Sequence, residues 1–340
     1  MSVLVTAKDR ATVSHDIIVL GGSTGAIEAV QTVCAGLPVD LPAAVFVVVH
    51  IAGHSQNLLA GLLRKTGPLR AVTAEDGMTP EAGCIYVAPA NSHLLLIGET
   101  LRLGRGPREN MTRPAADPLF RSAALSHGPR VIGVVLSGLL NDGASGLVAV
   151  KQCGGIAVVQ DPQDAGADEM PLGALEACDV DYRASAADMG ALLGKLARQP
   201  SGLEAPKPRG LALEVDIALG RPCDASIIAP IAEPVALSCP SCGGVLSAMK
   251  EEGPTRYRCQ VGHGFTAEAL AVDQESSTDE ALRVALRIIG ERATLAERMA
   301  KDARKKGRFS SAHLLEDRVA ELRVHAELIR EILIRAMGLS

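Results

Sequence analysis

The chain has few aromatic residues. Only 2% of its 340 residues are Phe, Tyr or Trp, and tryptophan is absent. A hydrophobic core must therefore be built from Val, Leu, Ile and Ala, and a hydrophobic content of 47% is ample for a core of domain size. Long hydrophobic runs are also missing, since the longest fall far short of the roughly 20 residues that a membrane-spanning helix needs.

An excess of positive charge and a leader sequence are missing as well. The formal net charge is −5, which gives no general reason to expect a nucleic acid as partner. The amino terminus carries Lys8, Asp9 and Arg10 and lacks the apolar segment of a signal peptide. We therefore expect a soluble, cytoplasmic protein of two or three structural units, without membrane insertion and without nucleic-acid binding.

A serine stands between glycines near the amino terminus. The apolar stretch 17–20 runs into Gly21-Gly22-Ser23-Thr24-Gly25 and then into a helical pattern. These glycines permit a tight turn that exposes the Ser23 hydroxyl beside the free N–H groups of a first helical turn, an arrangement that suits a nucleophile. A plain packing turn and a phosphate-binding loop are the alternatives, although the stretch supplies neither G-x-G-x-x-G nor a P-loop lysine.

Two further apolar runs end in residues that could activate this serine. The run 43–49 ends at His50, and the run 131–136 leads through Ser137 to Asp142. In an open α/β sheet the carboxyl ends of parallel strands line one crevice, so Ser23, His50 and Asp142 are expected to converge. The imidazole would take the hydroxyl proton, and the carboxylate would orient and stabilise the imidazole.

Each partner has an alternative interpretation. A histidine after a strand is often a loop residue bonded to backbone, and an Asp-Gly pair is often a turn. His54 is the nearest rival base, and Asp161, after the apolar stretch 156–159, is the rival carboxylate.

The order of patterns predicts the domain organisation. Residues 14–198 alternate apolar strands with helical patterns, which predicts a doubly wound, mostly parallel, Rossmann-like sheet wrapped by helices. Residues 199–236 form a linker rich in Pro, Gly and Ala, whose apolar piece 211–219 could pack back on the domain. Residues 277–338 contain two long helical patterns and predict a helical hairpin with an apolar stripe, through which dimerisation stays open.

The eight cysteines are best interpreted as reduced thiols in a chain without a secretion signal. Three of them join a histidine in residues 237–270, where Cys239 and Cys242 are followed by Cys259 and His263. Three thiolates and one imidazole at these spacings predict a closed, tetrahedral structural zinc site in a small ribbon-like unit. The alternative is four unligated residues, but so short a unit rarely folds without a metal.

Five ordered motifs resemble the catalytic domain of CheB-type protein-glutamate methylesterases over residues 14–198. They are GGSTGA (21–26), VVHI (48–51), RPAADPLFRSAA (113–124), LSGLLNDGASG (136–146) and EMPLGAL (169–175). The resemblance implies hydrolysis of glutamate methyl esters on the cytoplasmic helices of chemoreceptors, with deamidation of glutamines as a related activity and no catalytic cofactor. Ser23 would be the nucleophile, His50 the base and Asp142 the orienting carboxylate.

The same resemblance implies an oxyanion hole made by the backbone N–H groups of Thr24 and Leu139, with Met170 near the cleft. Family members usually carry methionine-glycine where this chain has Leu139-Leu140. Glycine at the second position can adopt positive φ or leave room for substrate, and leucine is unfavourable for either. The family's best-known members also begin with a receiver domain, so we expect any phosphorylation control here to come from a separate regulatory protein.

Together these observations predict a serine hydrolase that forms an acyl-enzyme on Ser23, releases methanol and is regenerated by water activated at His50. The main alternative is a degenerate domain, disabled around Leu140, that serves as an interaction module together with its zinc unit. Nucleotide binding at the turn 21–25 is a weaker alternative.

Overall fold

The computed structural model describes residues 14–50, 56–250 and 253–336. It divides into two compact units, Met1–Leu270 and Ala271–Ser340. The first unit is built on a seven-stranded sheet in the order β3-β4-β2-β1-β7-β8-β9, and every neighbouring pair of strands is parallel. The predicted doubly wound sheet is therefore confirmed.

The strands of this sheet are short and largely apolar. All six residues of β1 and all six of β2 are buried, as expected for parallel strands covered on both faces. The strands are β1 (Ile17–Gly22), β2 (Ala44–Val49), β3 (Arg70–Thr73), β4 (Cys84–Val87), β7 (Val131–Val135), β8 (Ile156–Gln160) and β9 (Tyr182–Ala184).

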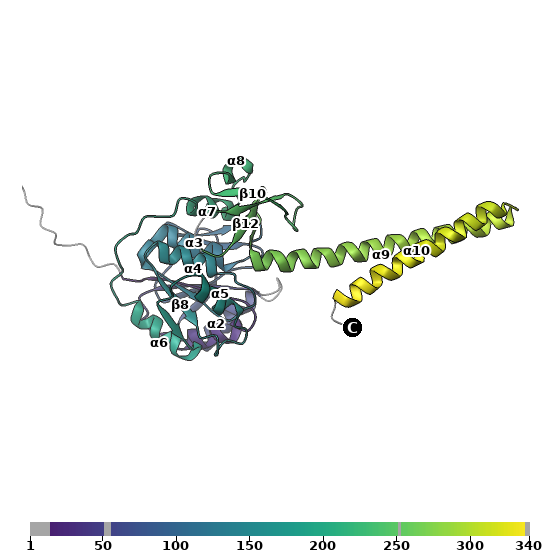
Figure 1. The fold of residues 1–340 in the computed structure, drawn as a ribbon. Helices are drawn as coiled ribbons and strands as arrows, with labels where there is room; N and C mark the ends of the chain where they lie inside the picture. Colours follow the sequence, from purple (N-terminus) through teal and green to yellow (C-terminus); the bar gives the residue numbers. More distant parts are fainter. Residues whose placement is uncertain (1–13, 51–55, 251–252, 337–340) are drawn as a thin grey trace, which may run out of the picture. The chain divides into compact units, whose positions relative to one another are not determined.

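Helices cover both faces of the sheet (Figure 1). One face packs against α1 (Ala26–Ala35), α2 (Gln56–Thr66) and α6 (Ala186–Leu196). The other packs against α3 (Ala116–His127), α4 (Ala144–Gln152) and α5 (Glu169–Ala177), together with the hairpin of β5 (His93–Ile97) and β6 (Thr100–Gly104). A short 3-10 helix, η1 (Gly128–Arg130), joins α3 to β7.

The segment predicted as a linker contains two helices, α7 (Leu211–Leu219) and α8 (Ala225–Ile228). The apolar piece 211–219 does pack on the domain, because Leu211 is buried in the core cluster that contains α3. A four-stranded antiparallel sheet follows in the order β10-β11-β12-β13. Its strands are β10 (Ala232–Ser238), β11 (Val245–Met249), β12 (Arg256–Cys259) and β13 (Gly264–Thr266).

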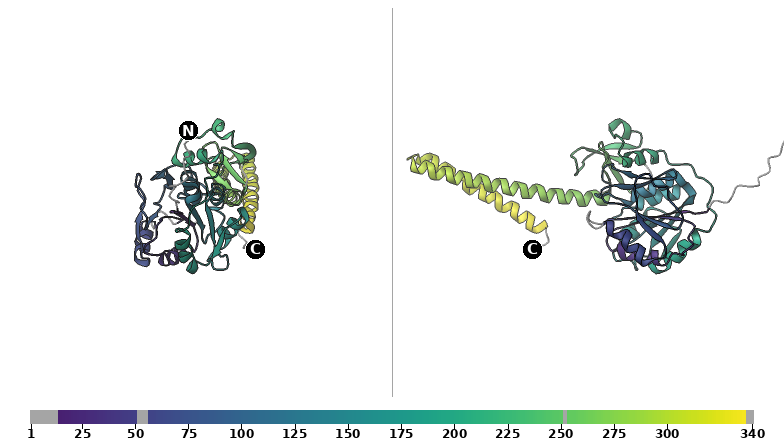
Figure 2. Two further views of the ribbon diagram at one scale, coloured as in Figure 1. Left: turned by 90° about the vertical axis from the view of Figure 1, so that its left-hand side faces the viewer. Right: turned by 180° about the vertical axis from the view of Figure 1, so that it is seen from behind.

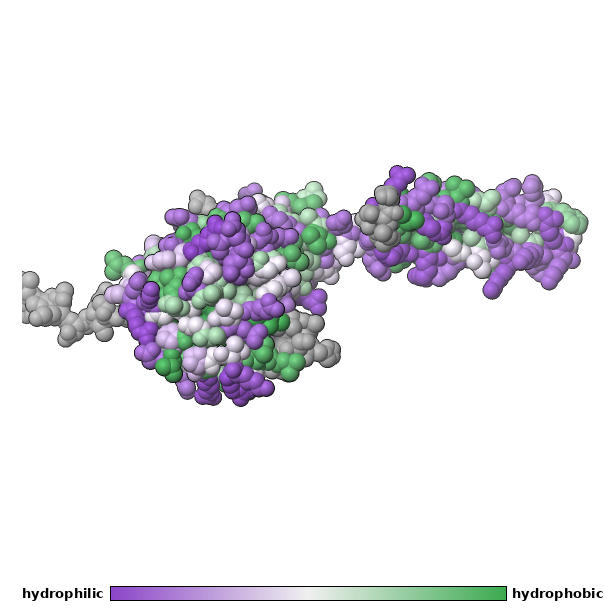
Figure 3. Space-filling view, turned by 90° about the horizontal axis from the view of Figure 1, so that it is seen from below, coloured by the Kyte–Doolittle hydropathy of each residue, from purple (hydrophilic) through white to green (hydrophobic). Residues whose placement is uncertain are grey.

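The carboxyl-terminal part is the predicted helical hairpin, made by α9 (Ala267–Lys305) and α10 (Phe309–Ala336). The two helices lie side by side in Figures 1 and 2. Ion pairs Arg304–Glu316 and Glu297–Arg323 join them, and Val319 on α10 is buried. Several apolar side chains stay exposed among charged ones (Figure 3), so dimerisation through this surface remains a prediction.

None of the helices in the described part of the chain is both long and apolar enough to cross a membrane. The boundaries proposed for the four segments, 14–198, 199–236, 237–270 and 277–338, remain predictions.

Close packing of α3 on α4 depends on Gly146. A Cβ atom added there would lie 2.6 Å from the Phe120 Cβ, whereas one added at Gly61 in α2 would meet nothing within 4 Å. We expect Gly146→Ala to lower the free energy of unfolding by about 1–3 kcal/mol, because overpacking outweighs the gain in helix propensity. Gly61→Ala, the matched control, should raise it by up to about 1 kcal/mol. Urea denaturation measures both, and a Gly146→Ala protein as stable as the wild type would contradict this packing.

Candidate active site

Parallel pairing of β1 with β2 brings Ser23 beside His50. Gly22 lies opposite Val49 in the sheet register, and Ser23 and His50 are the next residues of the two strands. The His50 N–H donates a hydrogen bond to the Gly22 carbonyl (3.1 Å), and the Ser23 N–H donates to the Ser137 carbonyl (2.9 Å). The carboxyl ends of β1, β2 and β7 therefore lie close together, as expected for an open α/β sheet.

Two glycines allow this convergence. Gly25 precedes α1 with φ 76°, and a Cβ there would lie 2.7 Å from Ser137 Oγ. At Gly138 a Cβ would lie 2.1 Å from the sulfur of Met170 and 2.9 Å from the Ser23 Cβ. The turn after β7 can thus approach the serine only because position 138 has no side chain, and Met170 lies next to that turn, as the resemblance implies.

His50 and Asp142 are in direct polar contact. His50 Nε2 lies 2.8 Å from Asp142 Oδ2, and the histidine side chain is 14% exposed while that of the aspartate is 3% exposed. Since this contact occupies Nε2, Nδ1 is the ring atom left to face the serine. Among the described residues no hydrogen bond joins Ser23 Oγ to His50; such catalytic bonds often shorten only when substrate binds.

Asp142 is buried at the amino-terminal end of α3. Its carboxylate accepts hydrogen bonds from the Ala116 N–H (2.5 Å), the Asp117 N–H (3.3 Å) and Asn110 Nδ2 (2.9 Å). The free N–H groups of a helix start favour a negative charge. Burial opposes ionisation, but the hydrogen bond and charge of His50, with the donors of Ala116 and Asn110, hold the pKa of Asp142 at about 2.

Asn110 and Thr112 are site residues that sequence reasoning missed. Asn110 bonds both Asp142 and Asp117 Oδ2 (3.2 Å). Thr112 Oγ1 lies 3.3 Å from His50 Nε2 and donates its hydrogen to the Glu109 carbonyl. Their only signal in the sequence is their place just before the motif 113–124, whose start provides the N–H groups that bind Asp142.

Asp117 is a second carboxyl group beside the first. Its Oδ1 accepts hydrogen bonds from the N–H groups of Gly143 (3.1 Å) and Gly146 (2.6 Å). Burial, followed by repulsion from Asp142, raises the pKa of Asp117 to about 7. One carboxyl group of the pair is thereby kept ionised for His50, while its neighbour holds a proton over much of the acidic range.

Of the two expected oxyanion donors, Thr24 directly follows Ser23, and Leu139 directly follows Gly138, the residue that approaches Ser23. Among the described residues, the N–H groups of Thr24 and Leu139 donate no hydrogen bond. Leu140 adopts φ 61°, the conformation for which glycine was expected, and its N–H donates to Glu169 Oε2 (2.6 Å). A leucine in this region is strained by roughly 1–2 kcal/mol, but the turn is formed.

Of the two rival residues, the structure describes only Asp161. Asp161 Oδ1 accepts hydrogen bonds from Arg183 (2.6 Å) and from the Gln163 N–H (2.9 Å). His54 lies outside the described residues.

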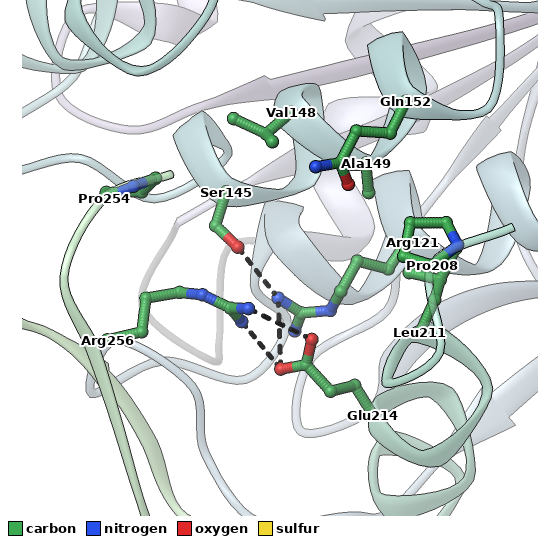
Figure 4. A pocket seen from close by; sticks show the side chains of 10 residues that line it. All are labelled: Arg121, Ser145, Val148, Ala149, Gln152, Pro208, Leu211, Glu214, Pro254 and Arg256. Atoms are coloured by element: carbon green, nitrogen blue, oxygen red, sulfur yellow. Dashed lines mark hydrogen bonds and ion pairs between the residues drawn. The ribbon is translucent and has the colours of Figure 1, made fainter. Parts of the chain in front are cut away.

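Arg121, Glu214 and Arg256 belong to a buried ion network, part of which Figure 4 shows. Glu214 on α7 contacts Arg256 (2.6 Å), Arg258 (2.8 Å) and Arg121 (3.9 Å). Glu109 pairs with Arg121 and with Arg258 (3.1 Å). Burial opposes charge on Glu214, yet the surrounding arginines lower its pKa, so the network joins α3, α7 and β12 through charges that stay paired.

We call the β10–β13 sheet with its four predicted ligands the Cys/His unit. Cys239, Cys242, Cys259 and His263 bring their ligand atoms within 4.8 Å of one another. The Cys242–Cys259 sulfur distance is 3.7 Å, and His263 Nδ1 lies 3.5 Å from the Cys259 sulfur and 3.8 Å from that of Cys239. Tetrahedral zinc requires sulfur–sulfur distances of about 3.8 Å and sulfur–nitrogen distances of about 3.6 Å, so the group fits this metal.

Positive-φ glycines shape both halves of this cluster. Gly243 (φ 71°) donates its N–H to the Cys239 carbonyl (2.7 Å), and Gly262 (φ 101°) donates to the Cys259 carbonyl (2.9 Å). Each cysteine-containing turn thus bends back so that its ligands point to one centre. Gly262 therefore has the same part in the second turn that Gly243 has in the first.

The fold and site define an α/β protein with a serine, a histidine and a buried aspartate at the carboxyl ends of its strands. Residues 18–193 match the CheB methylesterase family, to which this chain belongs. The crystal structure of the Thermotoga maritima CheB methylesterase catalytic domain superposes with a TM-score of 0.52 at 31% identity, covering 54% of this chain and 100% of that one.

Curated proteins with similar sequences are named for the activity of the same family. A protein of Leptospira interrogans, provisionally named for protein-glutamate methylesterase and protein-glutamine glutaminase activity, is 38% identical over 170 residues, 50% of this chain and 88% of that protein. An Anaeromyxobacter dehalogenans protein-glutamate methylesterase/protein-glutamine glutaminase is 38% identical over 166 residues, 49% of each chain. The segment after residue 198 lies outside the matched family domain.

The carboxyl pair predicts a pH dependence of stability. Because the pKa of Asp117 is higher in the folded state than in the unfolded chain, its protonated form stabilises the folded state. This stabilisation is fully present below about pH 4 and is lost as the pH rises through about 7. The excess stability of wild type over Asp117→Asn should therefore fall between pH 4 and pH 7. The difference between the two proteins cancels the contributions of the buried His15, His93 and His127 to the pH dependence of stability. Their lowered pKa values act in the opposite direction. Urea denaturation across this range measures the difference, and a flat difference would contradict the assignment.

Proposed function

We propose that the protein is a serine hydrolase that demethylates glutamate methyl esters on the cytoplasmic helices of chemoreceptors in a chemosensory pathway, and that it also deamidates glutamine. Membership of the CheB methylesterase family supports the reaction class. The observation that carries the proposal for this chain is the 2.8 Å contact between His50 and the buried Asp142, at strand ends that place His50 beside Ser23.

The proposed reaction has two halves. Ser23 Oγ attacks the ester carbonyl carbon while His50 Nδ1 accepts its proton, and the N–H groups of Thr24 and Leu139 stabilise the oxyanion. Asp142 holds the ring through Nε2 and stabilises the imidazolium. The imidazolium then protonates the departing methoxide, which leaves as methanol. Water activated by His50 hydrolyses the acyl-enzyme to a glutamate carboxylate and free Ser23. No cofactor takes part in these steps.

Removing the nucleophile should abolish this reaction. We expect Ser23→Ala to lower methanol release from methylated receptor by about 10⁴-fold or more with an unchanged Tm, because triad members act as a unit. Asp142→Asn should lose nearly as much. Ser310→Ala, an exposed position on α10, is the control and should retain full activity. Wild-type turnover in a folded Ser23→Ala protein would exclude the proposed nucleophile.

We further propose that the Cys/His unit holds a structural zinc ion. Support comes from the four ligand types and their mutual distances, because three thiolates and one imidazole complete the tetrahedral ligand set of a structural zinc site. The ion would fix the two turns of the unit and would supply no chemistry to the ester.

Metal analysis tests this site. The purified protein should contain about one zinc per chain, and Cys259→Ser should lose it and make the unit sensitive to protease. Ser241→Ala, which lies between the first two ligands and offers no ligand of its own, should keep the metal. Protein prepared without chelator and found free of zinc would rule out the proposed site.

A further inference from the structure

The Cys/His unit is hydrogen-bonded to the part of the site that holds the carboxylate. The Asn110 N–H donates to the Gly264 carbonyl (2.9 Å), and the Gly264 N–H donates to the Arg108 carbonyl (3.3 Å). Gly264 follows directly after His263, one of the four ligand residues. Strand β13 of the unit thus extends along the loop that carries Asn110, and the two also form a parallel bridge between Glu109 and Gly264.

Asn110 connects this strand to the catalytic carboxylate. On one side its Oδ1 accepts the Thr266 N–H (3.0 Å), and on the other its Nδ2 donates to Asp142 Oδ1 (2.9 Å). Both Asn110 (φ 47°) and Met111 (φ 66°) have left-handed backbone conformations. Such conformations persist when the surrounding structure determines them, and here β13 supplies that support.

Thr266 also holds the residue before the carboxylate. Its Oγ1 donates to Asn141 Oδ1 (2.5 Å), and Asn141 Nδ2 donates to Glu268 Oε2 (2.6 Å) at the start of α9. Thr266 therefore reaches Asp142 by two routes, through Asn110 by its backbone N–H and through Asn141 by its hydroxyl, and a substitution that removes the hydroxyl breaks only the second. Thr266 is 1% exposed, so water does not compete for these bonds.

Ion pairs of Arg258 hold the Cys/His unit against the α/β domain. Arg258, directly before the ligand Cys259, is 2% exposed and contacts Glu109 (3.1 Å) and Glu214 (2.8 Å). Arg258 Nη1 also donates to the carbonyl of Gly262 (2.8 Å), inside the second ligand turn. Arg258 thus connects the second ligand turn to Glu109, which directly precedes Asn110.

We propose that the Cys/His unit is part of the catalytic site: the Thr266 hydroxyl positions Asp142 against His50 by holding Asn141, while the Thr266 backbone N–H binds Asn110. This inference rests on the proposed esterase function. Thr266 is a positioning residue, since it touches neither the reacting atoms nor His50. Ester hydrolysis then depends on the integrity of the metal cluster, although the metal takes no part in the chemistry.

The test separates positioning from stability. In full-length protein, Thr266→Val should lower kcat on methylated receptor about tenfold to a hundredfold with little change in KM, because a small displacement of a catalytic group reduces turnover strongly. Thr266→Ser keeps the hydroxyl and should restore kcat. Thr266 Oγ1 also accepts the Ala269 N–H at the start of α9, so Ser185→Ala, which removes the equivalent cap of α6, is the matched control and should keep kcat.

A second measurement does not depend on turnover. The proton NMR signal of the His50 Nε2–H, which reports its bond to Asp142, should shift in Thr266→Val and in Cys259→Ser but not in Ser185→Ala. Wild-type kcat and an unchanged signal in folded Thr266→Val would overturn the inference while leaving the esterase function intact. An inactive wild-type enzyme would contradict the esterase function, and the NMR signal would still decide whether Thr266 positions Asp142.

Discussion

The site depends on keeping one carboxylate ionised where water cannot reach it. An isolated buried charge is very costly, and Asp142 avoids this cost by accepting hydrogen bonds from His50, Asn110 and the first N–H groups of α3. Burial and repulsion from Asp142 raise the pKa of the neighbouring Asp117 to about 7, so that below this pH the two carboxyl groups are not both charged. The negative charge beside His50 is therefore preserved over the neutral range.

This requirement explains why elements far apart in the chain meet at one point. Strands β1, β2 and β7 supply the serine, the histidine and the turn before the aspartate, while α3 supplies its free N–H groups. The loop 108–112 adds Asn110 and Thr112, and the Cys/His unit adds Thr266. The Cys/His unit lies outside the matched family domain, yet it is hydrogen-bonded to residues of the site.

Much of this arrangement was predictable from the sequence, for identifiable reasons. Continuous apolar runs that lead to Ser23 and His50 predict parallel strands whose carboxyl ends meet, and the Cys and His spacing predicts the observed cluster. Asn110, Asp117 and Thr266 were not predictable, because their roles arise from long-range contacts that leave no local periodicity. The linker contains α7 because Leu211 packs on α3 and Glu214 pairs with arginines of distant segments.

The central claim is that Ser23 becomes a nucleophile through His50 held by Asp142. Mass spectrometry of the full-length protein after treatment with a serine-directed fluorophosphonate tests it most directly. The account predicts a single covalent adduct on Ser23, formed rapidly in the wild type and far more slowly in Asp142→Asn. An adduct on another residue, or ester hydrolysis that continues after Ser23 is fully modified, would contradict it.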